Sequence, residues 1–355
     1  MKLVHNFSAG PGILPELVIK QAAAAVLNFD NLNLSILEIS HRSKNYVAVM
    51  DTARQLVKDL LLLDDNYEVF FLGGGASLQF AMVPYNLLGT KAAYINTGVW
   101  STKAIKEAKI IGEVDVIASS EDKNFNYIPK NYTIPTDADY LHITSNNTIF
   151  GTQFKQFPSS PIPMVCDMSS DIFSRPIDGK QFALIYAGAQ KNMGPAGCTM
   201  VAVRKDVLGK VNRKMLSMLD YSVHIKGESM YNTPPVYPVY VSMLTMQYVK
   251  DNGGVAAMEK LNNAKAELLY NEIDRNPLFT GTVAKEDRSV MNINFVMNDT
   301  TKEEAFNKIW KEAGISGLPG HRDVGGYRAS MYNAMHIDSV RALVQVMQQA
   351  EQQLA

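Results

Sequence analysis

The sequence predicts an α/β fold: a large domain with a mostly parallel β-sheet flanked by helices, followed by a smaller α+β domain. The main observation is a series of short apolar runs separated by helix-like or loop segments, a pattern typical of parallel sheets. A length of 355 residues also exceeds the usual size of one domain. The pattern of apolar and polar residues changes near residue 254, where we place the boundary between residues 17–254 and 255–355.

The elements of the large domain follow one another along the chain. Residues 15–29 predict a helix, because Pro15 suits a first turn and an alanine-rich body follows. Residues 46–63 carry apolar side chains at helical spacing, and residues 101–111 are also helix-like. The expected strands are the apolar runs at residues 68–72, 92–95, 114–118, 140–144, 163–166, 182–186 and 198–203.

The C-terminal part has a different texture. Residues 255–273 are rich in Ala, Glu, Lys and Leu and predict a long helix, which leads into an alternating run at 289–297. A helix at 301–313, a glycine-rich section at 317–326 and a terminal helix complete the small domain. No internal repeat is visible.

Composition argues against several classes of function. Hydrophobic residues make up 46% of the chain, and the net charge of −1 gives no support for a nucleic-acid or anionic-membrane partner. Cys166 and Cys198 lie in apolar runs and are expected to be reduced core residues. The N-terminus has no signal-peptide core, and no apolar stretch approaches the ~20 residues of a membrane-spanning helix. We therefore expect a cytoplasmic protein. The six histidines show no metal-ligand spacing, so the sequence predicts no metal site.

Lys191 is the residue that most directly suggests chemistry. The run at 182–186 predicts a buried strand, small residues follow it, and Lys191 precedes a Gly-Pro-Ala-Gly turn at 194–197. A lysine in such a pocket is poorly solvated, and burial favours its neutral amine, the form that makes a Schiff base with an aldehyde cofactor. Taken alone, the pattern fits an ordinary strand-end lysine better, so a catalytic role for Lys191 depends on the evidence from the rest of the chain.

A glycine-rich turn at 73–75 joins the run at 68–72 to the start of a helix. Such a helix N-terminus offers unpaired N–H groups and a positive dipole end, which suit a phosphate. The turn is not a Walker A loop, because no Gly-Lys-Ser/Thr follows, and it lacks the G-x-G-x-x-G spacing. A plain helix-capping turn is the alternative.

Asp167 and Trp100 each follow an expected strand, where function collects in open parallel sheets. Asp167 stands 24 residues before Lys191, so one crossover and the next strand could bring both to one cleft. An aspartate there could keep a pyridine nitrogen protonated, and Trp100 could stack on a cofactor ring. The alternatives are a turn-capping aspartate and a tryptophan of the core.

Segments spread along the whole chain match the motifs of one enzyme family, at residues 6–11, 40–42, 73–80, 174–176, 186–197, 231–235, 320–322 and 328–333. On these segments the chain resembles the phosphoserine aminotransferase family of class-V pyridoxal-phosphate enzymes. The resemblance implies the fold-type I architecture and a homodimer with shared active sites. It also implies an N-terminal segment, residues 1–16, that packs near the small domain.

The same resemblance implies how the cofactor, pyridoxal 5′-phosphate, is held. Lys191 would form the Schiff base and move a proton between the substrate Cα and cofactor C4′. Asp167 would pair with the pyridinium nitrogen, and Trp100 would stack on the ring. The cofactor phosphate and the rest of the pocket would be contacted by Ala76, Ser77, Thr148, Gln190 and, from the neighbouring subunit, Asn232 and Thr233.

The charge of the implied substrates calls for two cationic clusters. Phosphoserine and 3-phosphohydroxypyruvate each carry a carboxylate and a phosphate, and guanidinium groups bind both kinds of anion in a bidentate manner. Arg328 resembles the family's carboxylate clamp, with Ser8 nearby. Two His-Arg pairs resemble its phosphate-recognition residues, namely His41, Arg42, His321 and Arg322. Ser77 stands where some relatives carry arginine, which leaves one cation fewer near the phosphate.

The resemblance implies a ping-pong transamination. L-glutamate would leave its amino group on the cofactor and depart as 2-oxoglutarate, and 3-phosphohydroxypyruvate would then become O-phospho-L-serine, as in serine biosynthesis. The four-carbon 3-hydroxy-2-oxo-4-phosphooxybutanoate of pyridoxine biosynthesis is a second expected substrate.

Four other functions fit less well. A cysteine desulfurase is unsupported because no cysteine follows Cys198, and a serine hydrolase because no G-x-S-x-G elbow occurs. An alanine–glyoxylate type transaminase would have no use for the His-Arg pairs. A non-catalytic cofactor-binding protein would not need Lys191 together with Asp167.

Overall fold

The larger sheet has seven strands, and it lies within a computed structural model that describes residues 4–322 and 324–354. The strands are β2 (Tyr67–Leu72), β3 (Lys91–Asn96), β4 (Glu113–Ser119), β5 (Leu141–Thr144), β6 (Met164–Asp167), β7 (Leu184–Gly188) and β8 (Thr199–Arg204). Their order is β2-β8-β7-β6-β5-β3-β4. Strand β8 is antiparallel to both neighbours, and the other pairs are parallel. The predicted mostly parallel sheet is confirmed.

Every predicted apolar run overlaps one of these strands, but the run at 182–186 was placed two residues too early. Phe182 ends a short 3-10 turn (Gly179–Gln181), and β7 begins at Leu184. Ala187 and Gly188 pair with Met200 and Thr199 of β8, so these small residues belong to the ladder and not to the turn. The turn that carries Lys191 therefore starts later than the apolar pattern indicates.

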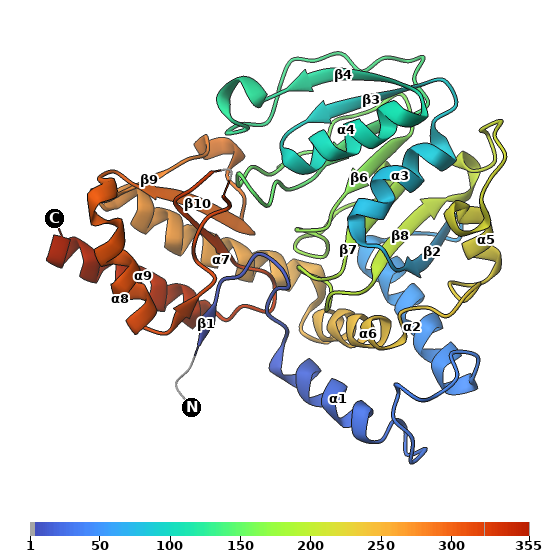
Figure 1. Cartoon of the computed structure of the whole chain (residues 1–355), viewed down its shortest axis with the longest axis horizontal. Helices are drawn as coiled ribbons and strands as arrows, with labels where there is room; N and C mark the ends of the chain where they lie inside the picture. The colour runs from blue at the N-terminus through green and yellow to red at the C-terminus, as the bar shows by residue number, and fades with distance from the viewer. Residues whose placement is uncertain (1–3, 323, 355) are drawn as a thin grey trace.

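Helices cover both faces of the sheet (Figure 1). They are α1 (Glu16–Leu27), α2 (Lys44–Leu61), α3 (Gly75–Leu87), α4 (Val99–Ile111), α5 (Tyr221–Lys226) and α6 (Val236–Asp251). Successive side chains of a strand point to opposite faces. Accordingly, Phe71 and Ile185 join the apolar cluster that includes α2 and α6, whereas Phe70 and Leu184 join the cluster under α3 and α4.

The sequence patterns did not reveal α6. Its apolar residues lie on more than one side of the helix, since α6 packs against α1, α2 and α7. A helix buried on several sides lacks the one-sided spacing by which surface helices are recognised.

The C-terminal elements form a second group around a smaller sheet (Figure 1). They are α7 (Gly254–Arg275), β9 (Phe279–Gly281), β10 (Asn292–Met297), α8 (Glu303–Glu312), β11 (Ile315–Ser316), β12 (Tyr327–Ser330) and α9 (Ile337–Leu354). Strands β12, β10 and β9 are antiparallel neighbours. The N-terminal strand β1 (His5–Asn6) pairs with β11, and Phe7 is buried in the apolar cluster of this group.

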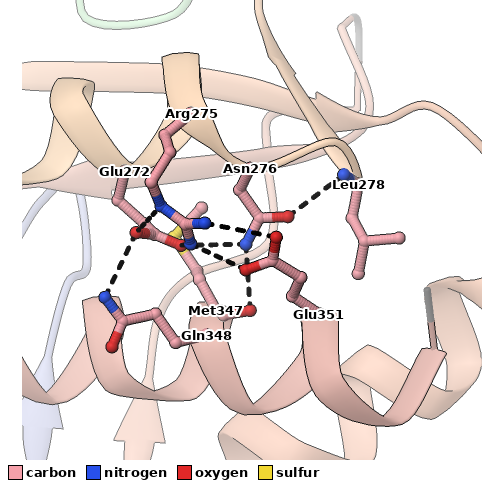
Figure 2. Close-up of polar contacts among 7 residues, drawn as sticks. All are labelled: Glu272, Arg275, Asn276, Leu278, Met347, Gln348 and Glu351. Atoms are coloured by element: carbon pink, nitrogen blue, oxygen red, sulfur yellow. Dashed lines mark hydrogen bonds and ion pairs between the residues drawn. The ribbon is translucent and has the colours of Figure 1, made fainter.

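A buried carboxylate joins α7 to α9 (Figure 2). Glu272 is only 4% exposed and accepts hydrogen bonds from Arg275, Asn276 and Gln348. Arg275 also reaches Glu351 of α9 at 2.7 Å, so one guanidinium bridges two carboxylates. These contacts fix the terminal helix against α7. Among the described residues, no helix is long and apolar enough to cross a membrane.

Candidate active site

Three neighbouring parallel strands bring predicted site residues to one edge of the larger sheet. Asp167 is the last residue of β6, Thr148 follows β5, and Lys191 follows β7. The amine Nζ of Lys191 donates a hydrogen bond to Thr148 Oγ1 at 2.7 Å. Trp100, in the first turn of α4 after β3, has its ring centroid 5.5 Å from the same Nζ. Carboxyl ends of parallel strands thus assemble the centre of the site.

The surroundings of Lys191 favour its neutral form more than water would. Burial lowers the pKa of Lys191 to about 8, the carboxylate of Asp167 opposes that shift, and the Arg328 guanidinium adds to it. The N-terminal segment helps to cover this lysine, because the Gly12 N–H donates to the Gln190 carbonyl at 2.7 Å. A Cβ on Gly12 would lie 2.8 Å from the Lys191 carbonyl oxygen, so only glycine fits so close. Gln190 is itself partly buried.

Asp167 is buried, with one carboxylate oxygen occupied and the other available. Its Oδ1 accepts from the Ser169 N–H at 2.9 Å and the Ser169 hydroxyl at 2.6 Å. Among the described residues, no hydrogen bond reaches Oδ2. Burial raises the pKa of Asp167, and the positive charge of Lys191 and the bonds from Ser169 oppose that rise. Sequence reasoning missed Ser169, although a serine two residues after a strand-end aspartate is a recognisable turn signal.

The glycine turn before α3 forms a cradle of backbone N–H groups. Gly74 and Gly75 have φ of +91° and +67°, in the left-handed region that glycine adopts most easily. Helix α3 starts at Gly75, so the N–H groups of Ala76 and Ser77 lie in its first turn, where intrahelical acceptors are lacking. Ala76 is partly buried and Ser77 is exposed. This helix end suits an anion such as a phosphate.

Arg328 brings a guanidinium from β12 to the same place. Its Nη1 donates to the Thr148 carbonyl at 3.3 Å, so Thr148 contacts both Arg328 and Lys191. The Nε of Arg328 is buried and has no hydrogen-bond partner within the described ranges. Ser8 lies near this strand, because the Phe7 carbonyl accepts from the Ser330 N–H at 3.2 Å. A partly desolvated guanidinium with a spare donor suits a carboxylate.

The two predicted His-Arg pairs do not lie together within one chain (Figure 1). His41 and Arg42 lie in the segment between α1 and α2, whereas His321 and Arg322 lie in the hairpin before β12, and Figure 1 shows these two segments well apart. Arg42 is exposed, and the buried His41 Nε2 has no partner in the described part of the chain.

Asn232 and Thr233 lie on the surface beside the glycine turn. Both are exposed, and with Gly73 of the same chain they line a cavity of about 370 Å³. The described residues contain no group of three or more His, Cys, Asp or Glu side chains placed to hold a metal ion.

Comparison with known proteins places this chain in a family. Residues 4–343 match the model of the class-V aminotransferases. The phosphoserine aminotransferase of Flavobacterium johnsoniae is 63% identical over 98% of both chains, and that of Parabacteroides distasonis is 59% identical over 98% of this chain and 99% of its own. The chain belongs to the class-V aminotransferase family and is a pyridoxal-phosphate-dependent transaminase.

Solved structures agree with this assignment. The phosphoserine aminotransferase of Bacillus circulans subsp. alkalophilus is 43% identical, with a TM-score of 0.96 over 99% of both chains. The pyridoxal-phosphate-bound phosphoserine aminotransferase of Trichomonas vaginalis is 36% identical, with a TM-score of 0.92 over 98% of this chain and 100% of its own.

Proposed function

We propose that this transaminase interconverts 3-phosphohydroxypyruvate and O-phospho-L-serine, with L-glutamate and 2-oxoglutarate as the second pair, as a step of serine biosynthesis. The observation that carries the proposal is the meeting of Lys191 and Arg328 at Thr148, which sets an amine beside a carboxylate-binding guanidinium. The names and high identity of the relatives supply the phosphorylated substrate. An α-amino acid bound by its carboxylate at Arg328 would present its Cα to Lys191.

The donor set at the sheet edge fits pyridoxal phosphate. The N–H groups of Ala76 and Ser77 would bind its phosphate, the open Oδ2 of Asp167 its ring nitrogen, and the Trp100 indole would stack on the ring. Gln190, beside Lys191, and Thr148 would complete the pocket. When bound, the cofactor supplies an aldehyde carbon that links to amines and a ring that accepts the electron pair left at the substrate Cα.

Lys191 would then move the proton. With its pKa lowered to about 8 by burial, a larger fraction of its amine is neutral near physiological pH than for an exposed lysine. A neutral Nζ can take the proton from the substrate Cα and return it to the cofactor carbon. The hydrogen bond to Thr148 holds Nζ in place, and the N-terminal segment over Lys191 limits access of water.

The substrate phosphate would be bound by both His-Arg pairs in a homodimer. Within one chain the two pairs lie in separate segments, so His41 and Arg42 would serve the partner's site beside His321 and Arg322 (Figure 1). The side-chain carboxylate of glutamate would use the same cations. Ser77 offers no charge there, so these pairs would carry the whole phosphate interaction.

Exposed apolar residues support the dimer. Leu216, Met218 and Tyr231 are 63%, 48% and 47% exposed, and Met218 lines the same cavity as Asn232 and Thr233. Apolar surface of this kind marks protein contacts. We propose that Asn232 and Thr233 reach the cofactor phosphate of the neighbouring subunit there.

We further propose the division into residues 1–16, 17–254 and 255–355, with the enzyme located in the cytoplasm. The separate apolar clusters support the division, although α7 contributes Met258 to one cluster and Leu269 to the other. The two free, buried cysteines suit a reducing compartment.

We also propose 3-hydroxy-2-oxo-4-phosphooxybutanoate of pyridoxine biosynthesis as a second substrate, because one added carbon and hydroxyl leave both anionic ends in place. Comparing kcat/KM for the two keto acids tests it, and no turnover of the longer one would reject it.

An absorbance titration of the holoenzyme tests the main proposal. Adding O-phospho-L-serine should remove the band of the lysine-linked cofactor, and 2-oxoglutarate should restore it, whereas L-serine should have little effect. An equal response to both amino acids would indicate a general transaminase and would remove the role of the His-Arg pairs. A protein that shows no such band after addition of pyridoxal phosphate would contradict the site itself.

A further inference from the structure

A second aspartate lies buried four residues after Asp167 and has no role in the site described so far. Asp171 is 6% exposed and sits in the turn after β6, where its N–H donates to the Met168 carbonyl at 3.2 Å. Among the described residues no lysine or arginine forms an ion pair with it. Burial raises the pKa of Asp171, and the positive charge of Arg175, the hydrogen bonds from Ser145 and Gln153 and the charge of Lys155 oppose that rise and favour the ionised form.

The neighbours of Asp171 are both hydrogen-bond donors. Its Oδ1 accepts from the Ser145 hydroxyl, and its Oδ2 accepts from Gln153 Nε2 at 3.1 Å. The orientation of the Gln153 amide is fixed, because its Oε1 accepts from the Val290 N–H at 3.2 Å and from Lys155 Nζ at 3.3 Å. The amide therefore presents its NH2 to Asp171, which matches an ionised carboxylate.

Ser145 connects this second carboxylate to the first. The Ser145 N–H donates to the Asp167 carbonyl oxygen at 2.9 Å, and its hydroxyl oxygen lies 3.1 Å from the same atom. One serine thus contacts the backbone of Asp167 and the side chain of Asp171. The position of Asp167 at the end of β6 depends on this contact as well as on the bonds from Ser169.

We propose that Asp171 is a positioning residue for the cofactor: through Ser145 it fixes Asp167, and its charge adds to the anionic subsite for the ring nitrogen. The inference rests on the proposed placement of that nitrogen at Asp167. Two buried carboxylates repel each other when the site is empty of a cation, and a protonated ring nitrogen relieves that repulsion. Asp171 therefore increases the preference of the site for a ring that carries a proton on its nitrogen.

The charge of Asp171 also acts on Lys191. Burial lowers the pKa of Lys191 to about 8, and the negative charges of Asp167 and then Asp171 oppose that lowering. The field of Asp171 thus extends beyond its hydrogen-bond partners to the reacting amine.

Asparagine is a well-matched replacement for Asp171. Its Oδ1 would accept from Gln153, and its NH2 would donate to the Ser145 oxygen, leaving the Ser145 hydroxyl free to donate to the Asp167 carbonyl. Every hydrogen bond keeps a partner, so D171N removes the charge and little else. Asp287 offers a control, since it is also buried, accepts from the Ile128 N–H at 2.9 Å, and does not contact Ser145.

The test compares two ligands of the cofactor-free full chain: pyridoxal phosphate and its analogue with carbon in place of the ring nitrogen. D171N should raise the dissociation constant of pyridoxal phosphate on the order of tenfold, equivalent to one pKa unit of interaction, and leave that of the analogue unchanged. D287N should alter neither constant. Asp167→Asn, measured in parallel, should show the same discrimination to a larger degree.

The outcomes separate the inference from the placement on which it rests. If D167N discriminates between the ligands but D171N weakens both equally or neither, Asp171 does not act on the ring nitrogen and the inference is wrong. If D167N fails to discriminate, the placement of the nitrogen and this inference fall together. Should D171N not fold, S145A provides the second test and is expected to weaken pyridoxal phosphate selectively.

Discussion

Replacing Thr148 by valine should lower the pKa of Lys191 by about one unit. The change keeps the branched shape of the side chain and removes the hydroxyl that accepts from Lys191 Nζ at 2.7 Å. A hydrogen bond contributes about 1.5–3 kcal/mol when one partner is charged and about 0.5–1.5 kcal/mol when both are neutral. The protonated amine therefore loses about 1–1.5 kcal/mol more than the neutral amine, or roughly 0.7–1.1 pKa units. Starting from about 8, the pKa should move toward 7.

The rate at which pyridoxal phosphate condenses with the cofactor-free chain measures this pKa, because only the neutral amine of Lys191 reacts. The inflection of the pH–rate profile should move to lower pH in T148V and stay in place in T148S, which retains the hydroxyl. An unmoved inflection in T148V, or the same movement in T148S, would show that the hydrogen bond does not set the pKa.

Three further predictions concern the substrate, the dimer and the core. R328K should raise the KM for phosphoserine about 10–100-fold, because an ammonium cannot form the two parallel bonds of a guanidinium. An unchanged KM in steady-state kinetics would contradict the role of Arg328 as the carboxylate-binding residue. Mixing the K191A and R42A proteins should restore about a quarter of wild-type activity if Arg42 serves the partner's site, because about half of the dimers are then mixed and each mixed dimer has one intact site of two. If the mixture stays as inactive as the two separate variants, Arg42 does not serve the partner's site. Lys265 is fully buried, and burial lowers its pKa to about 7 from 10.5, so the unfolded chain binds the extra proton between these values and stability rises with pH there. Between pH 7 and pH 9, the free energy of unfolding of K265M should rise less than that of the wild type, by about 1.4 kcal/mol per pH unit at most. Equal rises in the two proteins, measured by denaturant unfolding, would contradict the lowered pKa of Lys265.

Much of the fold could be predicted because the central strands are buried on both faces. Such strands are continuous apolar runs, as in Phe182–Tyr186, and each run marked a strand to within a few residues. The strand order and the reversed direction of β8 could not be predicted, since both depend on pairing between distant segments. Helix α6 was not predicted, because it is apolar on several sides and lacks the one-sided spacing of a surface helix.

The residues of the site also differ in whether the sequence could predict them. Asp167 stands directly after an apolar run and Lys191 a few residues after the next run, and strand ends meet at one edge of a parallel sheet, so their proximity follows from local pattern. Ser145 also stands directly after an apolar run, but its role and that of Asp171 could not be predicted, because a polar residue in a turn acquires its role only when a distant segment supplies its partner. Arg42 shows the further limit, since its proposed partner is another chain.

The two ends of the proposed substrate meet parts of the protein that differ in rigidity, and this difference bears on specificity. At the carboxylate end, the chain neighbours of Arg328 and of Lys191 belong to separate apolar clusters. Buried amides join the two parts: Asn146 donates to Asn292 at 2.7 Å, and Asn292 to Ser330 at 2.9 Å. Such neutral, fully buried bonds allow little adjustment. At the phosphate end, Arg42 is an exposed side chain on a segment between helices, which can follow a substrate of different length. Variation in substrate length should therefore be accommodated at the phosphate, while changes at Cα are excluded.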